Sequence, residues 1–314
     1  MSRICGICMI RDALDLVPFL VGHYLRAGFD RLHFIDDQSS DGTFEALATI
    51  GKCESRVTVQ QVFHNAARQA ELMSAAANRM ISEGYETVFP FDADEFWNID
   101  AAQIRAVATR PGLFVGRWVQ FVQDRSEGFS RRRGLFNVRY RAPVFADTDA
   151  ASVESYDRSF VCLSVPKIAF IAGSEVAVAR GQHALECGPG EILAQDLEVF
   201  HLPLRSAGEI DRRVQRADRV LGIARDGEAW QTRFFRTATQ AGLGDVVWAA
   251  NSASADGFLD LPRQRILLIP DSRFRSLMLR AGRYMLLRHP SVFLRAGHGS
   301  GRPQYGQSTS PVST

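Results

Sequence analysis

The first hundred residues alternate short apolar runs with amphipathic segments, and this alternation limits the possible folds more than any other feature of the chain. The apolar runs cover residues 4–10, 32–35, 57–62 and 87–91. Each run is short and continuous, as expected for a strand that is buried on both faces. Between them, apolar residues recur three and four positions apart, which is the spacing of one helix face. The series predicts an α/β fold with a Rossmann-like, mostly parallel sheet and flanking helices.

Capping residues indicate where these helices begin and end. Asp12 can cap the first helix, which Gly28 would end, and Asp41 stands where the second helix would begin. Asn65 can cap a third helix that ends near Gly84. Strands and helices therefore follow one another without interruption up to the fourth apolar run.

The residues after position 100 fall into segments with different sequence patterns. Residues 113–123 and 160–171 have the composition of further strands, and apolar residues at helical spacing follow them. The C-terminal end is rich in Gly, Ser, Thr and Pro, which is typical of disorder. We therefore expect a first domain at residues 1–205, a helical C-terminal extension at 206–290 and a disordered tail at 291–314.

Composition narrows the class of protein. The 314 residues carry a formal net charge of +2, which gives no general signal for nucleic acid. The only lysines are Lys52 and Lys167, and no Gly-Lys-Ser/Thr sequence occurs, which excludes a P-loop. The five cysteines are an odd number and widely scattered, so we expect reduced thiols, with Cys5 and Cys8 buried. We expect a cytoplasmic protein without a signal peptide, and no run of 18 apolar residues occurs that could span a membrane.

Polar and charged residues follow each of the four predicted strands. Parallel strands direct their carboxyl ends to one edge of the sheet, where ligands bind in such folds. The sequence therefore predicts a binding site at this edge, although strand ends are often polar without a functional reason. The residues that follow the four strands are Arg11 and Asp12, Asp36 and Asp37, His64, Asn65 and Arg68, and finally Asp92, Asp94 and Glu95.

The three acids Asp92, Asp94 and Glu95 form the sharpest single motif. Neighbouring carboxylates raise each other's pKa unless a cation neutralises them, and a hard divalent ion prefers oxygen ligands. Because Mg²⁺ or Mn²⁺ is often held by one or two carboxylates together with phosphate oxygens, the motif favours a metal bridge to a nucleoside diphosphate.

Two other carboxylate motifs fit less well. An EF-hand loop that began at Asp92 would need Gly at its sixth position and Glu at its twelfth, where this chain has Trp97 and Gln103. A phosphatase with an aspartyl nucleophile usually shows Asp-x-Asp-x-Thr/Val after its first strand. Here the fifth position is Phe96 and the motif follows the fourth strand, so neither alternative is favoured.

Taken in order, these motifs resemble those of the family 2 glycosyltransferases with the GT-A fold, particularly a bacterial subgroup close to the family 92 enzymes. The likeness includes a D-x-S-x-D-G-T turn and a D-x-D-E-F signature, and it departs from the family at Arg11 and Asp12, where Lys-Asn-Glu is usual. The segments that carry the resemblance are residues 8–12, 28–43, 92–96, 167, 181–183 and 200–206.

This resemblance implies an enzyme that takes a sugar from a nucleoside-diphosphate-sugar donor, with the first domain as the donor-binding and catalytic domain. Asp36 or Asp37 would hold the ribose or the base, and Arg68 would approach the diphosphate. Asp92 and Asp94 would hold Mn²⁺ or Mg²⁺, which stabilises charge on the leaving diphosphate. The other implied donor contacts are Arg11, Asp12, Lys167 and Arg205.

The resemblance also implies inversion, which requires a general base for the acceptor hydroxyl. The candidate catalytic residues are Glu95 and His183. Glu95 can instead brace the turn, and His183 can instead be a metal ligand, a phosphate contact or a surface residue. Further candidates for the base are Glu154, Asp157, Glu175 and Glu186.

Several downstream residues have both a functional and a structural interpretation. His201 follows a strand-like run beside Arg205 and is a candidate metal or phosphate ligand, or else a structural histidine. Lys167 is a candidate phosphate or acceptor contact, or else a surface residue whose stem covers apolar neighbours. Trp97, Trp118 and Phe121 can belong to a sugar-stacking platform or to the core.

Residues 272–288 form a basic amphipathic segment in which five arginines accompany apolar residues at helical spacing. Residues 272–314 contain no acidic residue, and residues 1–271 carry a formal charge of about −5. Such a helix can make peripheral contact with an anionic membrane, and the alternative is a helix that packs on the acidic main domain.

The sequence thus predicts a metal-dependent glycosyltransferase of polysaccharide biosynthesis. Its acceptor would be a glycan, a lipid-linked molecule or a protein. Two alternatives remain: a nucleotidyl- or phosphotransferase on a similar sheet, and a nucleotide-binding protein without catalytic activity. Release of pyrophosphate in place of a nucleoside diphosphate would favour the first alternative.

Overall fold

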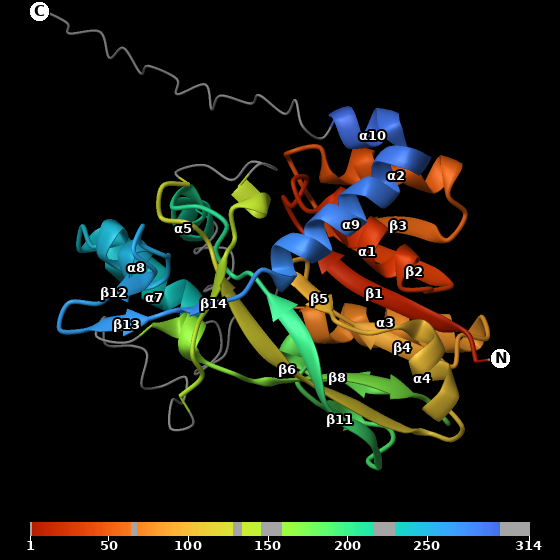
Figure 1. Cartoon of the computed structure of the whole chain (residues 1–314). Coiled ribbons are helices and arrows are strands. Elements are labelled where there is room, and N and C mark those ends of the chain that lie inside the picture. Colours follow the sequence, from red (N-terminus) through yellow and green to blue (C-terminus); the bar gives the residue numbers. More distant parts are fainter. Residues whose placement is uncertain (1, 64–67, 128–133, 146–158, 216–229, 296–314) are drawn as a thin grey trace, which may run out of the picture.

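A large mixed sheet forms the centre of the molecule (Figure 1). The computed structural model describes residues 2–63, 68–127, 134–145, 159–215 and 230–295. The strands of this sheet are β1 (Ile4–Ile10), β2 (Arg31–Asp37), β3 (Val57–Val62), β4 (Thr87–Pro90), β5 (Glu95–Trp97), β6 (Gly112–Val122), β7 (Tyr140–Arg141), β8 (Pro166–Ile171), β11 (Ile192–His201) and β14 (Ile269–Pro270). Among the described residues, two short strand pairs lie outside it: β9 (Ala177–Val178) with β10 (Leu185–Cys187), and β12 (Phe258–Asp260) with β13 (Arg265–Leu267).

Most of the long strands in the sheet run in one direction. The strand order is β14-β7-β6-β8-β4-β1-β2-β3, with β11 beside β6 and β5 beside β11. β1 pairs in parallel with β2 and β4, and β2 pairs in parallel with β3. Because β8 is antiparallel to both β4 and β6, β6 runs in the direction of β1, and β11 is parallel to β6. The carboxyl ends of β1, β2, β4, β6 and β11 therefore meet at one edge.

Helices cover both faces of this sheet. The α-helices are α1 (Val17–Arg26), α2 (Thr43–Cys53), α3 (Gln69–Ser82), α4 (Ala101–Val107), α5 (Gly208–Gln215), α7 (Trp230–Gln240), α8 (Gly244–Ala250), α9 (Arg273–Arg288) and α10 (Pro290–Arg295). In the described part of the chain, short 3-10 turns are η2 (Gly134–Phe136), η4 (Phe160–Cys162) and η5 (Arg180–Gln182). α1 and α9 share the core on one face, with Tyr24 and Met285 buried in it, and α3 buries Met73 and Met80 in the core on the other face.

A third apolar cluster lies beyond the main sheet. It joins η4 to α5, α7 and α8 through Phe160, Ile210, Phe235 and Trp248. α9, in contrast, returns to the main core, where a Cβ at Gly22 of α1 would lie only 2.4 Å from the carbonyl oxygen of Ala281. The division of the chain at residue 205 stays a prediction.

The predicted fold class is confirmed. The protein has an α/β fold with a mostly parallel central sheet, flanking helices and further helices in the C-terminal part of the chain, the arrangement expected for the GT-A type. Cys5 and Cys8 are buried, as predicted. No helix among the described residues has both the length and the apolar character needed to cross a bilayer.

Two local predictions were wrong. Asp12 does not cap α1, which begins at Val17; with a φ of +44° it accepts a hydrogen bond of 2.6 Å from the backbone N–H of Ser40 and so joins two loops at the sheet edge. Residues 160–171 are not one strand, because β8 begins only at Pro166. Proline lacks the N–H of a strand interior and is found at strand starts. The cap predicted at Asn65 lies outside the described residues.

Candidate active site

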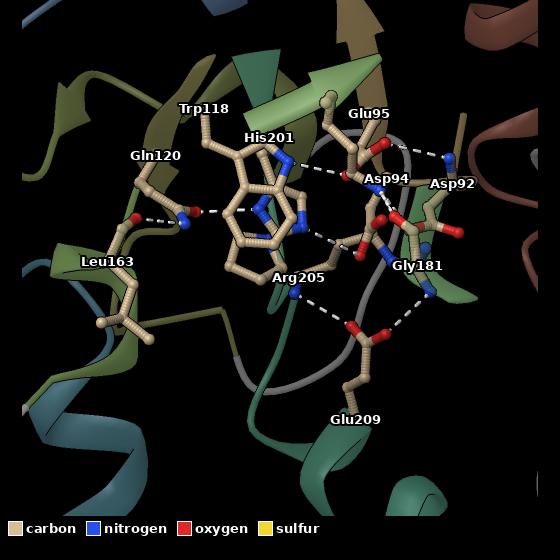
Figure 2. Close-up of polar contacts among 12 residues, drawn as sticks. Asp92, Asp94, Glu95, Trp118, Gln120, Leu163, Gly181, His201, Arg205 and Glu209 are labelled. Atoms are coloured by element: carbon tan, nitrogen blue, oxygen red, sulfur yellow. Dashed lines mark hydrogen bonds and ion pairs between the residues drawn. The ribbon is translucent and has the colours of Figure 1, made fainter. Parts of the chain in front are cut away.

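The register of three strands assembles the candidate site. His201, the last residue of β11, pairs with Gln120 of β6 on one side and with Glu95 of β5 on the other. Asp92 and Asp94 lie in the turn between β4 and β5. Residues that are far apart in the sequence therefore become neighbours at the edge where the parallel strands end (Figure 2).

Two acids of the motif, Asp92 and Glu95, form ion pairs with the buried Lys167. The Lys167 ammonium lies 2.9 Å from Asp92 Oδ2 and 2.9 Å from Glu95 Oε1. It also lies 2.6 Å from the carbonyl oxygen of Gly181 and 3.1 Å from Gln182 Oε1. Lys167 is fully buried. Because an ammonium has three N–H donors, these four acceptors leave none for a ligand.

Glu95 is held by donors on both carboxylate oxygens. Trp118 Nε1 donates to Oε1 at 2.7 Å, and the backbone N–H of Asp92 donates to Oε2 at 3.1 Å. Burial raises the pKa of Glu95, and the charge of Lys167 opposes that rise. Burial also works against the charged form of Lys167, but Asp92 and Glu95 outweigh it and raise the Lys167 pKa above its ordinary value. Of the two roles expected for Glu95, the geometry favours bracing the turn.

The other half of the motif faces a histidine. Asp94 Oδ2 lies 3.6 Å from His201 Nε2. Gln120 Nε2 donates to the carbonyl of Leu163 at 2.8 Å, which turns its Oε1 toward His201 Nδ1, 2.9 Å away. Nδ1 therefore carries a ring proton, and Nε2, which faces a carboxylate oxygen, can hold either a second proton or a metal ion. Trp118 stacks on His201 with ring centroids 4.3 Å apart.

Positive charge surrounds Asp94. Burial works against its charged form, but the charges of His201, Arg213 and Arg205 outweigh this and hold the Asp94 pKa well below its ordinary value. Arg213 Nη2 lies 3.9 Å from Asp94 Oδ2 and donates to the carbonyl of Pro203 at 2.6 Å. Asp94 is therefore a carboxylate at neutral pH.

Asp94 and His201 fit a divalent cation as a pair of ligands. Two acceptors that face each other at 3.6 Å are brought together by a proton or a metal ion between them. Carboxylates suit Mg²⁺ and Mn²⁺, whereas imidazole is a ligand of first-row transition metals, so this pair favours Mn²⁺. Among the described residues, no three His, Cys, Asp or Glu side chains gather into a metal site. The remaining ligands of such an ion would be substrate oxygens and water.

Asp92 is engaged differently from Asp94. Its Oδ2 binds Lys167, and its Oδ1 accepts a hydrogen bond of 3.3 Å from Gln69 Nε2. Both carboxylate oxygens thus have protein donors, so the geometry favours Asp94 over Asp92 as a metal ligand, and the metal role given to Asp92 stays a prediction.

A cavity of about 170 Å³ opens beside Asp94. It lies between the loop after β1 and α5, and its charged lining consists of four guanidinium groups and three carboxylates. A guanidinium binds phosphate oxygens through paired N–H donors, so such a lining suits a phosphorylated ligand. Its charged lining residues are Arg11, Asp12, Asp94, Arg205, Glu209, Arg212 and Arg213. The structure therefore gathers four sequence-predicted residues here: Arg11, Asp12, Asp94 and Arg205.

Asp36 and Asp37 lie at the end of β2, beside Arg11. Arg11 Nη1 donates to Asp37 Oδ2 at 3.2 Å, and the backbone N–H of Ser39 donates to Asp36 Oδ1 at 3.1 Å. Both carboxylates are buried, yet Asp36 Oδ2 and Asp37 Oδ1 have no hydrogen-bond partner among the described residues. Two buried acceptors without donors are suited to hydroxyl or N–H groups of a ligand.

His183 also contacts Trp118. Its Nδ1 donates to the carbonyl of Pro166 at 2.7 Å, which leaves Nε2 without a proton. Burial lowers the pKa of His183, and the charge of Lys167 lowers it further. The ring of Trp118 lies edge-on at 5.6 Å. His183 can accept a proton at Nε2, and its role as general base stays a prediction.

The remaining candidates lie elsewhere. Arg68 is half exposed at the start of α3 and pairs with Glu71, and it does not line the cavity. Glu175 and Glu186 are exposed. Glu154 and Asp157 lie outside the described residues.

Several residues of the site were missed by sequence reasoning. Gln120 orients His201, Gln182 binds Lys167, and Glu209, Arg212 and Arg213 of α5 line the cavity. The adjacent arginines on a short helix after His201 were a usable signal for the last two residues. No local pattern marks the two glutamines, because their partners come from distant strands.

Comparison with known proteins finds structural similarity at low sequence identity. No protein-family model matches the sequence, and no curated protein matches it significantly. TarS of S. aureus has a TM-score of 0.37 at 13% identity, covering 77% of this chain and 43% of the TarS chain. The mannosyltransferase PcManGT from Pyrobaculum calidifontis, in complex with GDP-Man and Mn²⁺, has a TM-score of 0.37 at 17% identity, covering 94% and 85%. HddC from Yersinia pseudotuberculosis has a TM-score of 0.35 at 8% identity, covering 65% and 95%.

This chain spans less than half of the TarS chain that it matches. TM-scores of this size do not establish an activity, so the assignment of function depends on the residues of the site.

Proposed function

We propose that this protein is a glycosyltransferase that uses a nucleoside-diphosphate-sugar donor. The observation that carries the proposal is the arginine-lined cavity beside the Asp94–His201 pair. A diphosphate needs cationic partners on its oxygens, and Arg11, Arg212 and Arg213 supply them around a cavity that is also lined by three carboxylates.

The ligand pair Asp94 and His201 would hold the divalent cation of such an enzyme. When bound, that ion acts as a Lewis acid on the charge of the leaving diphosphate. Gln120 keeps His201 in the tautomer whose Nε2 is free for a metal. Lys167 holds Asp92 and Glu95 and thereby fixes the turn that carries Asp94.

The nucleoside would bind beside β2. The unpartnered oxygens of Asp36 and Asp37 can accept hydrogen bonds from a ribose hydroxyl or a base N–H. Arg11 is near enough to join this subsite to the cavity, since it donates to Asp37 and also lines the cavity. Arg205, which is paired with Asp15 at 3.3 Å and with Glu209 at 3.2 Å, would fix the cavity wall.

His183 is the residue we propose as general base. Its Nε2 is unprotonated, and its lowered pKa keeps it neutral at neutral pH. It would take the proton of an acceptor hydroxyl as the sugar bond to that oxygen forms and the bond to the diphosphate breaks. Membership of family 2, inversion at the sugar carbon and a glycan or lipid-linked acceptor belong to the same proposal.

Product analysis with purified protein tests this function. The protein is incubated with UDP-, GDP- and dTDP-sugars and Mn²⁺, and released nucleoside diphosphate is measured. We expect slow donor hydrolysis with at least one donor, and loss of that activity in D94N but not in D245N, an exposed control at the start of α8. Absence of release from every donor, together with no nucleotide binding by calorimetry, would contradict the proposal.

The second candidate is a nucleotidyltransferase, which would use the same arginine-lined cavity for a triphosphate. The same incubation separates the two. A nucleoside triphosphate with a sugar phosphate would then release pyrophosphate, and the glycosyltransferase proposal expects none.

A further inference from the structure

The outer face of α9 is basic and apolar at once. The inner face is buried against α1 through Phe274, Leu277, Met278, Ala281 and Met285. Figure 1 shows α9 crossing over α1 at the surface of the molecule, with α10 after its C-terminal end. The sequence allowed either membrane contact or packing on the main domain for this helix. Packing on the main domain accounts for the buried inner face, but it does not account for the exposed outer face.

Leucines on the outer face are exposed to an unusual degree. The exposed fraction is 51% for Leu279, 43% for Leu286 and 73% for Leu287. They follow Arg275 and Arg283 at helical spacing, so they lie on the side opposite the buried residues. Scattered exposed leucines need no explanation, but three on one helix face form an apolar strip.

Arginines alternate with these leucines. Arg275, Arg280 and Arg283 are exposed, and no hydrogen bond or ion pair joins them to another described residue. Residues 272–314 contain no acidic residue. Their charge is therefore available to an external anionic surface, whereas Arg273 at the start of the helix is already paired with Glu198 at 2.8 Å.

We propose that the outer face of α9 docks on an anionic lipid membrane. An interfacial helix places leucines at the headgroup–acyl boundary while arginines bind lipid phosphates, and this face has both. A nucleic acid would use the arginines but not the exposed leucines. This inference does not depend on the proposed function, because the face lies on the surface of a helix and outside the cavity.

Vesicle flotation of the full chain tests the contact. One vesicle population is phosphatidylcholine and the other is phosphatidylcholine mixed with phosphatidylglycerol. We expect binding to the mixed vesicles that weakens as salt is added. We expect L279S/L287S to weaken this binding by about tenfold, and R280Q/R283Q to remove the preference for phosphatidylglycerol.

Matched controls are L267S, whose leucine is 64% exposed on β13, and R110Q, whose arginine side chain is 62% exposed. Both should bind as the unmodified protein does, and circular dichroism should show that all variants are folded. No binding to mixed vesicles, or equal binding by the outer-face variants, would overturn the proposal. Sedimentation that shows a dimer converted to monomers by L279S/L287S would overturn it in favour of self-association.

Discussion

The carboxylates of the Asp92–Glu95 segment lie in two different environments. Asp92 and Glu95 are neutralised from within the protein by the buried Lys167, at 2.9 Å from each. Asp94, between them in the sequence, faces His201 and an arginine-lined cavity. We call Asp92, Glu95 and Lys167 the closed region, because these charges neutralise one another. We call Asp94 and His201 the open region, because Asp94 lines a cavity that a ligand can enter.

This difference shows that one acidic motif can combine carboxylates that the protein neutralises itself with a carboxylate that faces a cavity. A buried carboxylate with its own cation is fixed in place, and a carboxylate beside a cavity can bind a ligand or an ion. Variants on the two sides should therefore separate into those that lose stability and those that lose activity.

The largest effect should come from breaking the closed region. K167M leaves Asp92 and Glu95 next to each other without their cation, and loss of one partner of a buried ion pair costs about 3–5 kcal/mol. Urea unfolding measures the loss, with K52M as control because Lys52 is exposed and is the only other lysine. K167M/E95Q should recover part of it. Equal stability of K167M and K52M would contradict the structural role of Lys167.

Substitutions in the open region should lower the rate of donor turnover. D94N removes a charged ligand and should lower donor turnover by roughly 100-fold or more, as loss of one transition-state contact commonly does. D92N should have a smaller effect on turnover, because Asp92 is bound to Lys167. Initial rates with Mn²⁺ measure both variants. A larger loss in D92N than in D94N would reverse the assignment of the two regions.

Substitution of Gln120 should affect only metal binding in the open region. Q120L removes the acceptor that orients His201, and loss of such a partner typically lowers metal affinity by about 10- to 100-fold. The measurement is Mn²⁺ titration followed by electron paramagnetic resonance, with Q103L as control because Gln103 is exposed on α4. Unchanged Mn²⁺ affinity in Q120L would show that Gln120 does not prepare His201 for a metal.

The smallest effect should be on the pH dependence of the free energy of unfolding. Because the Asp94 pKa is lowered in the folded protein, its charge contributes stability above the unfolded value of about 3.9, and that stability is lost as pH falls through the lower folded pKa. The stability difference between the unmodified protein and D94N should therefore shrink below about pH 4. Chemical unfolding at several pH values measures it, and a constant difference would argue against a lowered Asp94 pKa.

Much of the fold and the acidic edge could be predicted from local patterns. Apolar runs and helical spacing define β1 to β4, and the residues at or just after the ends of these strands include Asp36, Asp37, Asp92 and Asp94. The parallel direction of the strands then brings them to one edge.

The rest depends on long-range pairing that the sequence does not display. Lys167 reaches Asp92 only because β8 is inserted antiparallel between β4 and β6. Gln120 meets His201 only through the register of β6 with β11. For the same reason the sequence could not show that Lys167 is an internal cation and not a ligand contact.

Binding of Mn²⁺ tests the division between the two regions most directly. Electron paramagnetic resonance would follow the titration of Mn²⁺ into protein saturated with whichever of UDP, GDP and dTDP binds best. We predict one bound ion per chain in the unmodified protein and in D92N, and none in D94N or H201A. Retention of the ion in D94N together with its loss in D92N would contradict the assignment, as would equally tight nucleotide binding without any divalent ion.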